Sequence, residues 1–425
     1  MKKHFIFFAL FSISIFAQPA FEPDISLVES ELHFFKSDDV YSVFLLYKIP
    51  FNRLVFQKDG NTFNAGFKVS VEMLEQNSGS IARDFKEHKT TVNDFRLTTS
   101  QFAYIQGLIK FSLKAGKYII KPVYSDLNSN REFRLKPAVF STDSLNNLIG
   151  NPIVIKSDKH LCNDDQLISL ANYSSSIPFS SESYSLFIPI FNQSIDKITI
   201  KMTKENSKEF NFTKEIDDYV ILPYNLTECD NHIVFSNTVT SESYEVKLFT
   251  LKDISKDLIE GLYSLQVELS GEEKTEQTFK IPVRWINKPR SLYEPEKSFD
   301  YLELIENSDR VSELRNIRKE DLTHRLFDFW KKYDPTPETK FNELMAEFYY
   351  RIDYSELNFR ALANNNGARS DRGKIYVQYG SPESIDRFTD EYGRMLEQWK
   401  YVNPARTFTF IDKKGTGNFT LKSTP

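Results

Sequence analysis

The sequence predicts a multidomain, mainly β protein in which two tandem β-sandwiches precede a C-terminal α+β domain. Three observations lead to this prediction. Short segments rich in Val, Ile, Phe and Tyr alternate with turn residues as far as Trp285. A pattern of a turn glycine followed by a tyrosine occurs once in each half of that region. Helical periodicity begins only after Trp285.

Length and composition limit the class of protein. The chain has 425 residues, of which 40% are hydrophobic and 14% aromatic, so it has ample material for cores and does not resemble a disordered chain. At ~100–200 residues per domain, this length suggests two to four domains. The formal net charge is -5 and the pI is near 5.9, which argues against a nucleic-acid partner.

The first residues predict export. A charged start, Met1-Lys-Lys-His, is followed by the apolar run Phe5–Phe16 and by Ala17, the pattern of a signal peptide over residues 1–17. The run is shorter than the ~20 residues that span a bilayer, although an uncleaved anchor is the alternative. No transmembrane segment is expected after cleavage. We expect an exported protein in the periplasm, associated with the outer membrane, or outside the cell.

Residues 22–140 and 150–286 are predicted to form the two sandwiches, with a boundary near Ser141–Gly150. Both regions contain strand patterns bounded by turn signals. The strands expected in the first region are Tyr41–Lys48, Phe63–Met73 and Ile105–Leu113; those in the second are Tyr184–Phe191, Lys197–Met202, Tyr244–Leu251, Tyr263–Leu269 and Phe279–Trp285.

The pattern Leu-x-x-Gly-x-Tyr suggests what kind of sandwich this is. It occurs with Gly116 and Tyr118, and again with Gly261 and Tyr263. A tyrosine at a strand start whose hydroxyl bonds to nearby backbone is typical of the tyrosine corner in immunoglobulin-like sandwiches. We therefore expect two immunoglobulin-like domains.

The chain contains two cysteines, Cys162 and Cys229. In an exported protein an even number of cysteines is compatible with a disulfide, and such a bridge would contribute ~2–4 kcal/mol. Two buried free thiols are the alternative. Neither cysteine belongs to a CxxC motif.

Residues 290–425 are predicted to form the C-terminal α+β domain. Its first clear helix covers Lys319–Tyr333 and ends at Asp334-Pro335, since the residue before proline avoids helical angles. Thr336 is expected to cap the next helix. The apolar stripe of that helix would contain Phe341, Leu344, Met345, Phe348 and Ile352.

After these helices, loops and strands are expected again. We expect a polar loop over Gly367–Gly373, a short strand over Lys374–Tyr379, and a turn at Gly380–Glu383 that opens a helix. A further strand is expected over Leu396–Tyr401. The closing element is a hairpin formed by Thr407–Ile411 and Asn418–Leu421.

Several of these elements together resemble the GWxTD-domain proteins of bacteria. The residues that carry the resemblance are Trp330, Asp334, Pro335, Gly373, Gly380, Pro382 and Trp399, in the runs Phe329–Pro337, Asp371–Glu383, Glu397–Tyr401 and Phe410–Phe419. The family has no settled biochemical activity, so the resemblance implies an architecture without implying a reaction.

The naming motif of this family, Gly-Trp-x-Thr-Asp, is altered here to Gly367-Ala-Arg-Ser-Asp371. Gly367 and Asp371 match, a serine replaces the threonine, and Ala368 replaces the tryptophan. Because a tryptophan buries ~150–250 Å², this chain lacks either a packing anchor or a platform for a ligand.

Asp371 and Arg372 are the candidate binding residues. A carboxylate and a guanidinium on one loop are suited to a ligand or a partner. In the structural alternative, Asp371 caps its own loop and Arg372 makes an internal ion pair. The sequence shows no metal site, no cofactor motif and no catalytic residues, because its six histidines are scattered and Gly-x-Ser-x-Gly is absent.

Two functions remain open. The first is a non-enzymatic envelope or surface protein whose C-terminal domain binds a protein or glycan partner. The alternative is a hydrolase of envelope polymers with a site near Asp371 and Arg372.

Overall fold

The computed structural model describes residues 28–37, 40–79, 81–142, 148–156, 167–207, 210–236, 245–270, 275–361 and 365–423. Within these residues the protein is mainly β, with several sheets and with most of its helices in the C-terminal region. The predicted signal peptide, residues 1–17, lies outside the described residues. No helix of the described residues is long and apolar enough to cross a membrane.

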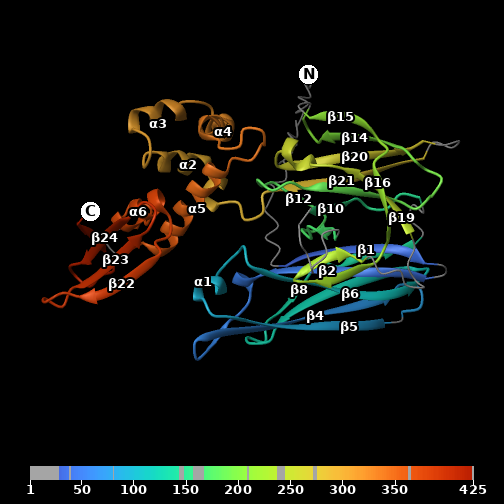
Figure 1. Cartoon of the computed structure of the whole chain (residues 1–425), viewed down its shortest axis with the longest axis horizontal. Coiled ribbons are helices and arrows are strands. Elements are labelled where there is room, and N and C mark those ends of the chain that lie inside the picture. Colours follow the sequence, from blue (N-terminus) through green and yellow to red (C-terminus); the bar gives the residue numbers. More distant parts are fainter. Residues whose placement is uncertain are drawn as a thin grey trace, which may run out of the picture.

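The strands before residue 285 form four stacked layers (Figure 1). Layer 1 contains β3 (Gln57–Asp59), β4 (Thr62–Glu75), β5 (Ile81–Val92), β7 (Lys117–Asp126), β8 (Glu132–Arg134) and β9 (Ala138–Ser141). Layer 2 contains β1 (Glu29–Ser37), β2 (Val40–Pro50) and β6 (Tyr104–Lys114). All neighbours in these two layers pair antiparallel.

Layers 3 and 4 form the second half of the stack. Layer 3 contains β10 (Ile153–Lys156), β11 (Ser169–Leu170), β13 (Ser185–Ile190), β16 (Tyr219–Pro223), β17 (Leu226–Cys229), β18 (His232–Phe235) and β19 (Glu245–Leu251). Layer 4 contains β12 (Ile177–Pro178), β14 (Ile198–Lys204), β15 (Asn211–Ile216), β20 (Gly261–Leu269) and β21 (Thr275–Arg284). Each strand expected before Trp285 is present, with ends shifted by at most a few residues.

Strand β2 explains why the layers form one stack. Its side chains alternate between two cores: Val43 and Leu45 pack against layer 1, whereas Phe44 and Leu46 pack against layer 3. All four are at most 1% exposed. Layer 2 is therefore covered on both faces. In the sequence, β2 is an unbroken apolar run, which is typical of a strand buried on both sides.

A polar contact also joins layers 2 and 3. The hairpin of β17 and β18 covers the edge of β6: Gln106 N–H donates to Asn231 Oδ1 at 3.0 Å, and Leu108 N–H donates to Glu228 Oε1 at 2.5 Å. Edge strands expose unpaired backbone groups, and these side chains satisfy two of them. A Cβ at Gly107 would lie 2.9 Å from Glu228 Oε1, so glycine permits this close approach.

The two tyrosines of the repeated pattern each bond back to the backbone. The Tyr118 hydroxyl donates to the carbonyl of Lys114 at 3.2 Å, and the Tyr263 hydroxyl donates to that of Ile259 at 3.0 Å. Each bond therefore reaches back four residues to the turn before the strand. Tyr263 also accepts a hydrogen bond from Ile259 N–H at 3.1 Å.

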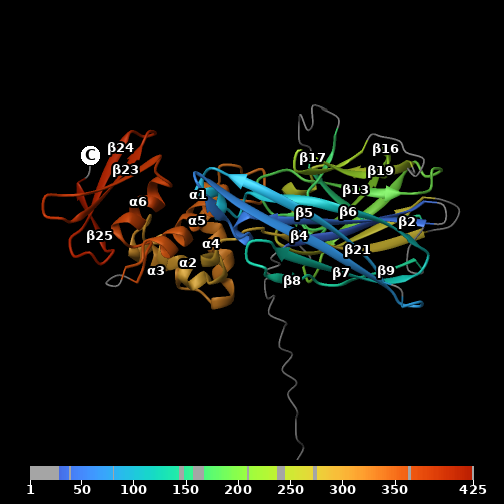
Figure 2. The ribbon, with the colours of Figure 1, turned by 90° about the horizontal axis from the view of Figure 1, so that it is seen from below.

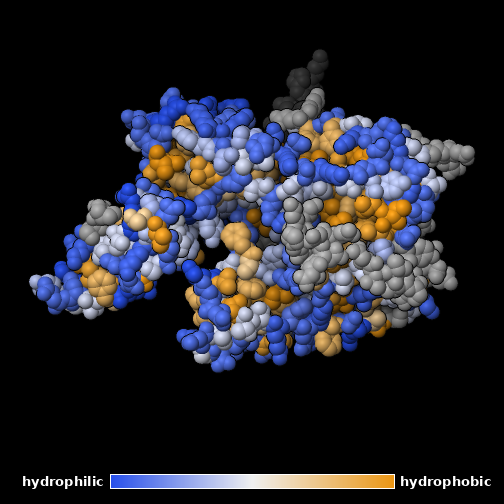
Figure 3. Space-filling view, viewed as in Figure 1, coloured by the Kyte–Doolittle hydropathy of each residue, from blue (hydrophilic) through white to orange (hydrophobic). Residues whose placement is uncertain are grey.

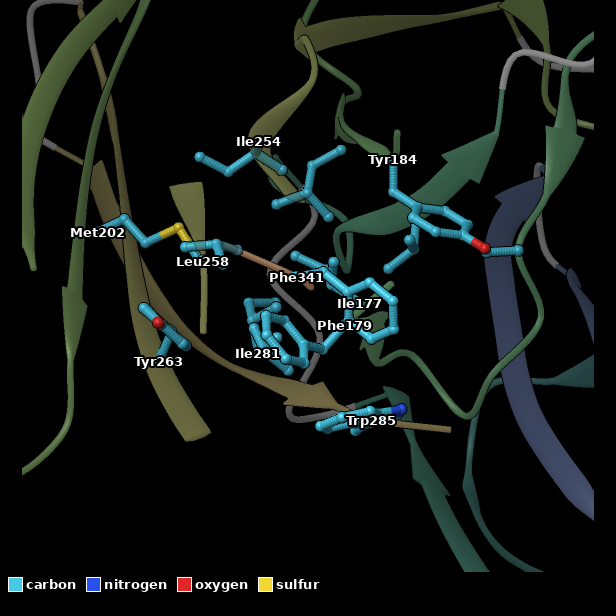
Figure 4. Close-up of a cluster of buried hydrophobic side chains, with 14 of the residues drawn as sticks. Ile177, Phe179, Tyr184, Met202, Ile254, Leu258, Tyr263, Ile281, Trp285 and Phe341 are labelled. Atoms are coloured by element: carbon cyan, nitrogen blue, oxygen red, sulfur yellow. The ribbon is translucent and has the colours of Figure 1, made fainter. Parts of the chain in front are cut away.

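The helices share a core with layers 3 and 4. Phe179, Trp285 and Phe341 pack edge to face with ring centroids 5.1–5.7 Å apart, so the second sandwich region meets the segment before α5 (Figure 4). The helices of the C-terminal region are η4 (Arg290–Tyr293), α2 (Pro295–Leu302), α3 (Ser308–Arg315), η5 (Lys319–Asp321), α4 (Leu322–Trp330), η6 (Lys331–Tyr333), α5 (Glu343–Asn358) and α6 (Asp371–Tyr379). Figure 2 shows them between the layers and the last sheet.

Helix α5 begins later than expected. The capping residue is Asn342, whose side chain accepts from Met345 N–H at 2.8 Å, and the prediction of a start at Thr336 is wrong. The Thr336 hydroxyl instead donates to Glu343 Oε2 at 2.5 Å. Leu344, placed in the apolar stripe by its spacing, is 47% exposed, because the buried face of α5 runs through Met345, Phe348 and Ile352 and Leu344 lies at its edge.

The C-terminal sheet is an antiparallel meander of β22 (Ser384–Thr389), β23 (Met395–Tyr401), β24 (Arg406–Asp412) and β25 (Phe419–Ser423). Its core is separate from that of the layers and is formed by Phe359, Tyr376, Trp399, Tyr401, Phe408 and Phe410. The predicted closing hairpin is confirmed. Its turn is fixed by the Asp412 carboxylate, which accepts from the N–H groups of Lys414, Thr416 and Gly417.

Candidate functional site

The loop with the altered motif leads directly into helix α6, where a strand over Lys374–Tyr379 was predicted. Ser370 is the N-cap: its Oγ accepts from Gly373 N–H at 3.0 Å. Gly380 ends the helix with φ +77°. The prediction is wrong because alternating apolar residues resembled a strand, whereas the cap at Ser370 and the glycine after the last turn are the signals of a helix.

The helix expected from Gly380–Glu383 is also absent, because the chain there enters strand β22. Pro382 is buried in this connection. The guanidinium of Arg351 in α5 donates to the carbonyl of Val377 at 3.1 Å and to that of Gln378 at 3.3 Å. Arg351 thus closes the C-terminal end of α6, as basic side chains do at helix ends.

The two glycines of the loop allow close backbone packing. A Cβ at Gly367 would lie 2.1 Å from the carbonyl oxygen of Ser355 in α5. A Cβ at Gly373 would lie 2.0 Å from the carbonyl oxygen of Gly367. Both positions therefore exclude any side chain, and α5, the loop and α6 meet backbone to backbone.

Ala368 occupies the position of the family's tryptophan. It is 0% exposed and belongs to the core shared by the helices and layers. The N–H groups of Gly367 and Ala368 donate to the Glu356 carboxylate at 3.3 and 3.2 Å. Arg369 donates to the carbonyl of Asp300 in α2 and to Glu303 Oε2 just after that helix, both at 2.7 Å. The loop is thereby bonded to both α5 and α2. The methyl group of Ala368 packs in the core.

Asp371 does not cap its own loop. Its Oδ2 accepts from Leu421 N–H in β25 at 2.8 Å, so the carboxylate joins the first turn of α6 to the last strand. Ser370 fulfils the capping role that the structural alternative gave to Asp371.

Arg372 lies beside Asp371 and contacts the same hairpin. It donates to the carbonyl of Gly417 at 3.2 Å and lies 3.5 Å from Glu397 Oε1. Its guanidinium also lies over the rings of Phe359 and Phe419, at 5.1 and 4.3 Å. Burial lowers the pKa of Arg372, and the Glu397 carboxylate opposes that shift. The arrangement is the internal ion pair of the structural alternative.

Glu397 is the central group that the sequence did not reveal. Its side chain is 2% exposed and accepts from Trp399 Nε1 at 2.7 Å and from Arg387 Nε at 2.8 Å. With Arg372 it forms a buried network between α6 and the sheet. Its partners come from three separate segments, so spacing could not identify it. The only local signal was the pair Glu397 and Trp399 on one face of a strand.

Of the other residues of the resemblance, Trp330 and Trp399 pack into the cores, whereas Asp334 and Pro335 form a turn. Trp330 is 3% exposed and contacts Phe348 with ring centroids 5.1 Å apart. Asp334 ends the preceding helix and its Oδ1 accepts from Thr336 N–H at 2.9 Å, with Pro335 between them.

The remaining candidates are the disulfide, a metal site and the cavities. Cys162 lies outside the described residues, so the pairing with Cys229 stays a prediction; Cys229 ends β17, and no described cysteine is free. Among the described residues no group of three or more His, Cys, Asp or Glu comes together as a metal site. The two cavities described in the protein lie in layer 1 and layer 4, and neither is lined by Asp371 or Arg372.

Comparison with known proteins gives one family match. A search of curated proteins finds no match. The family model of the GWxTD domain matches residues 261–423. The match begins in β20 of layer 4, so it includes the last two strands of the layers together with all the helices from η4 onward and the C-terminal sheet. Residues 261–423 of this chain therefore match the GWxTD domain.

Proposed function

We propose that this protein is an exported, non-enzymatic envelope protein whose C-terminal sheet binds a protein partner along strand β22. The observation behind this proposal is that every residue of β22 is exposed. The strand stands at the end of the sheet order and pairs with β23 on one side. An exposed edge strand is a template for an added strand.

The side chains of β22 support the proposal that the partner is a protein. Ile385 and Phe388 are 46% and 44% exposed, on opposite faces of the strand, and apolar residues reach the surface over this sheet (Figure 3). The charged residues that could protect the edge are already paired within the sheet: Asp386 with Lys400 and Arg387 with Glu397. The edge therefore keeps its backbone groups and two apolar side chains for a partner strand.

The layers would hold this sheet away from their own surface. We infer that they form two immunoglobulin-like sandwiches, because Tyr118 and Tyr263 make the same four-residue hydrogen bond at corresponding turns. Because layer 2 is buried on both faces, the two sandwiches would move as one body. Export rests on residues 1–17, and the mature chain is expected to begin at Gln18.

Among the residues that the structure describes, no contact favours the hydrolase alternative. Asp371 bonds to Leu421 and Arg372 bonds to Gly417, so both side chains are engaged with the closing hairpin. A substrate would have to displace these bonds.

Site-specific photo-crosslinking tests the proposal. A photoreactive residue at Ile385 in the full chain, expressed in its native host, should yield one defined adduct whose partner is identified by mass spectrometry. The matched control is Val402, which lies in the same sheet unit and is 72% exposed. Phe388→Lys should abolish the adduct at position 385. Equal labelling at both positions, or no adduct at 385, would contradict a partner on β22.

A further inference from the structure

A cavity of about 700 Å³ opens on layer 4. It is lined by residues of β14, β15 and β20, by the end of β19 and the connection that follows it, and by Lys340 from the segment before α5. Figure 3 shows apolar atoms among hydrophilic ones over β14 and β15. This volume is in the range of ~300–1,000 Å³ found for small-molecule sites.

The floor of the cavity is apolar. Leu251, Ile254 and Tyr263 line it and are at most 5% exposed. The Tyr263 hydroxyl is occupied by both backbone groups of Ile259, so the tyrosine presents its ring to the cavity side. Phe210 packs edge to face on that ring at 5.2 Å. A floor of this kind suits the apolar body of a ligand and offers little to a hydroxyl-rich one.

The rim carries positive charge. Lys204, Lys214, Lys252 and Lys340 line the cavity, with Asp257 as the single carboxylate among the lining residues. Lys252 is paired with Asp218 at 2.6 Å, whereas the other three lysines form no ion pair with any residue that the structure describes. Three ammonium groups are thus available around an apolar floor.

The position of Lys204 is fixed by the backbone. Its side chain passes over Gly261, where a Cβ would lie 2.7 Å from Lys204 Cε. The glycine has φ +149°, a conformation that other residues rarely adopt. The stem of Lys204 therefore packs against bare backbone, which directs the ammonium group to the rim.

We propose that this cavity binds an amphiphilic anion, a single molecule with one carboxylate or phosphate group on an apolar chain. The apolar floor takes the chain and the lysine rim takes the anionic head. An acidic glycan fits less well, because its hydroxyl groups would face Leu251 and Ile254 without partners. This site is separate from β22 and does not depend on the function proposed for that strand.

Calorimetric titration of the full chain with dodecanoate, below its micelle concentration, tests the site. One saturable site is expected. Dodecyltrimethylammonium has the same chain with a cationic head, and it should bind at least about tenfold more weakly, because like charges meet at the rim. Equal affinity for the two amphiphiles, or no saturable binding of dodecanoate, would overturn the proposal. The proposal would also be overturned if the protein sedimented with phosphatidylglycerol vesicles and free dodecanoate did not inhibit this binding.

Variants locate the site. Lys204→Gln with Lys214→Gln should weaken dodecanoate binding about fivefold, since each exposed ammonium–anion contact is modest. Asp257→Asn should strengthen it about twofold, a gain that misfolding cannot produce. The control is Lys201→Gln with Lys256→Gln, on the same strand and the adjoining turn but outside the cavity, and it should leave affinity unchanged. An equal loss in the control, or no gain with Asp257→Asn, would contradict the assignment.

Discussion

The four β layers and the C-terminal sheet unit, α6 with β22–β25, are both rich in strands but are stabilised differently. In the layers, apolar side chains fill three interlayer cores, and β2 contributes to two of them. In the C-terminal unit the core is small and includes Tyr376 of α6, and polar bonds of Asp371, Arg372 and Glu397 add to the attachment of this helix. Apolar cores accept many residues of similar size, whereas a polar attachment requires particular ones.

This difference accounts for the residue types of the motif. Gly367 permits contact with α5, Ser370 caps α6, and Asp371 joins the helix to β25. Each of these roles depends on the absence of a side chain or on one oxygen atom, so none could be met by a generic apolar residue. Ala368, by contrast, lies in an apolar core, where replacing one apolar residue by another changes the side-chain volume but removes no polar bond.

The largest expected effect breaks the layer stack. Phe44→Ala removes a fully buried ring between layers 2 and 3 and should lower the free energy of unfolding by about 3–5 kcal/mol. Chemical denaturation followed by circular dichroism measures this change. Phe85→Ala, at a ring that is 61% exposed on layer 1, is the control and should change stability by less than about 0.5 kcal/mol. Similar losses in both variants would show that layers 2 and 3 are not packed through β2.

The next effect breaks the backbone contact of the C-terminal unit. Gly367→Ala places a Cβ 2.1 Å from the Ser355 carbonyl and should destabilise this unit by about 3 kcal/mol. Limited proteolysis should then cut α6 and the sheet while the layers persist. Gly393→Ala meets no atom within 4 Å but has φ +74°, so it should cost only about 1 kcal/mol. If the two variants were equally protease-sensitive, the packing of Gly367 would not be decisive.

A smaller effect removes the central charge of the polar attachment. Glu397→Gln keeps the shape but leaves Arg372 buried without its carboxylate, and should cost about 2–3 kcal/mol. Thermal unfolding of the C-terminal unit, followed by tryptophan fluorescence of Trp399, measures it. Asp386→Asn, in an exposed pair with Lys400, should cost under about 1 kcal/mol. A reversed order would mean that α6 is attached mainly by apolar contacts.

Sequence patterns predicted the parts of the fold that depend on local signals. The strands that were predicted for the layers, helix α4 and the closing hairpin follow from period and turn residues, and they were found where expected. The stacking of layers 2 and 3 was missed because alternation was assumed for an unbroken apolar run. Strand β22 was missed because a strand exposed at every position has no hydrophobic period.

The candidate site was predicted less well than the fold. The sequence identified Asp371 and Arg372 as candidates, but it did not show that both bond to the closing hairpin. The partner of Asp371, for example, is Leu421, fifty residues later in the chain. It could not identify Glu397, because a buried carboxylate is recognised only through partners that folding brings together. The helix α6 was recoverable in principle, from Ser370 as a cap and Gly380 as an end signal.

A further prediction tests whether the interface between layers 2 and 3 is purely apolar. Lys48 is 4% exposed; its ammonium donates to the Ala171 carbonyl and lies over the rings of Tyr104 and Tyr173. Burial lowers the pKa of Lys48 from its ordinary value of 10.5 to about 7. Of the charges that face it, those of Glu29, Glu31 and Glu182 oppose this shift and that of Lys156 adds to it.

The sign of the pH effect follows from this lowered pKa. Between pH 7 and 10 the unfolded chain binds a proton at Lys48 that the folded chain has lost, so folding stability should rise with pH in this window. Lys48→Met should remove that rise and stabilise the protein by roughly 1–3 kcal/mol at pH 7. Urea unfolding across this pH range measures it, with the exposed Lys58→Met as control. The same slope in Lys48→Met as in the natural chain would contradict the prediction.

The smallest expected effect compares the two sandwiches with each other. Tyr263→Phe removes a hydroxyl that serves both the carbonyl and the N–H of Ile259, whereas Tyr118→Phe removes a single bond to Lys114. We expect losses of about 1–2 kcal/mol for Tyr263→Phe and about 0.5–1 kcal/mol for Tyr118→Phe, measured by denaturant unfolding. Tyr392→Phe, at a residue that is 72% exposed, should have no measurable effect. If Tyr118→Phe were the more damaging, the first turn would depend on its tyrosine for packing, and the likeness between the two corners would be one of sequence alone.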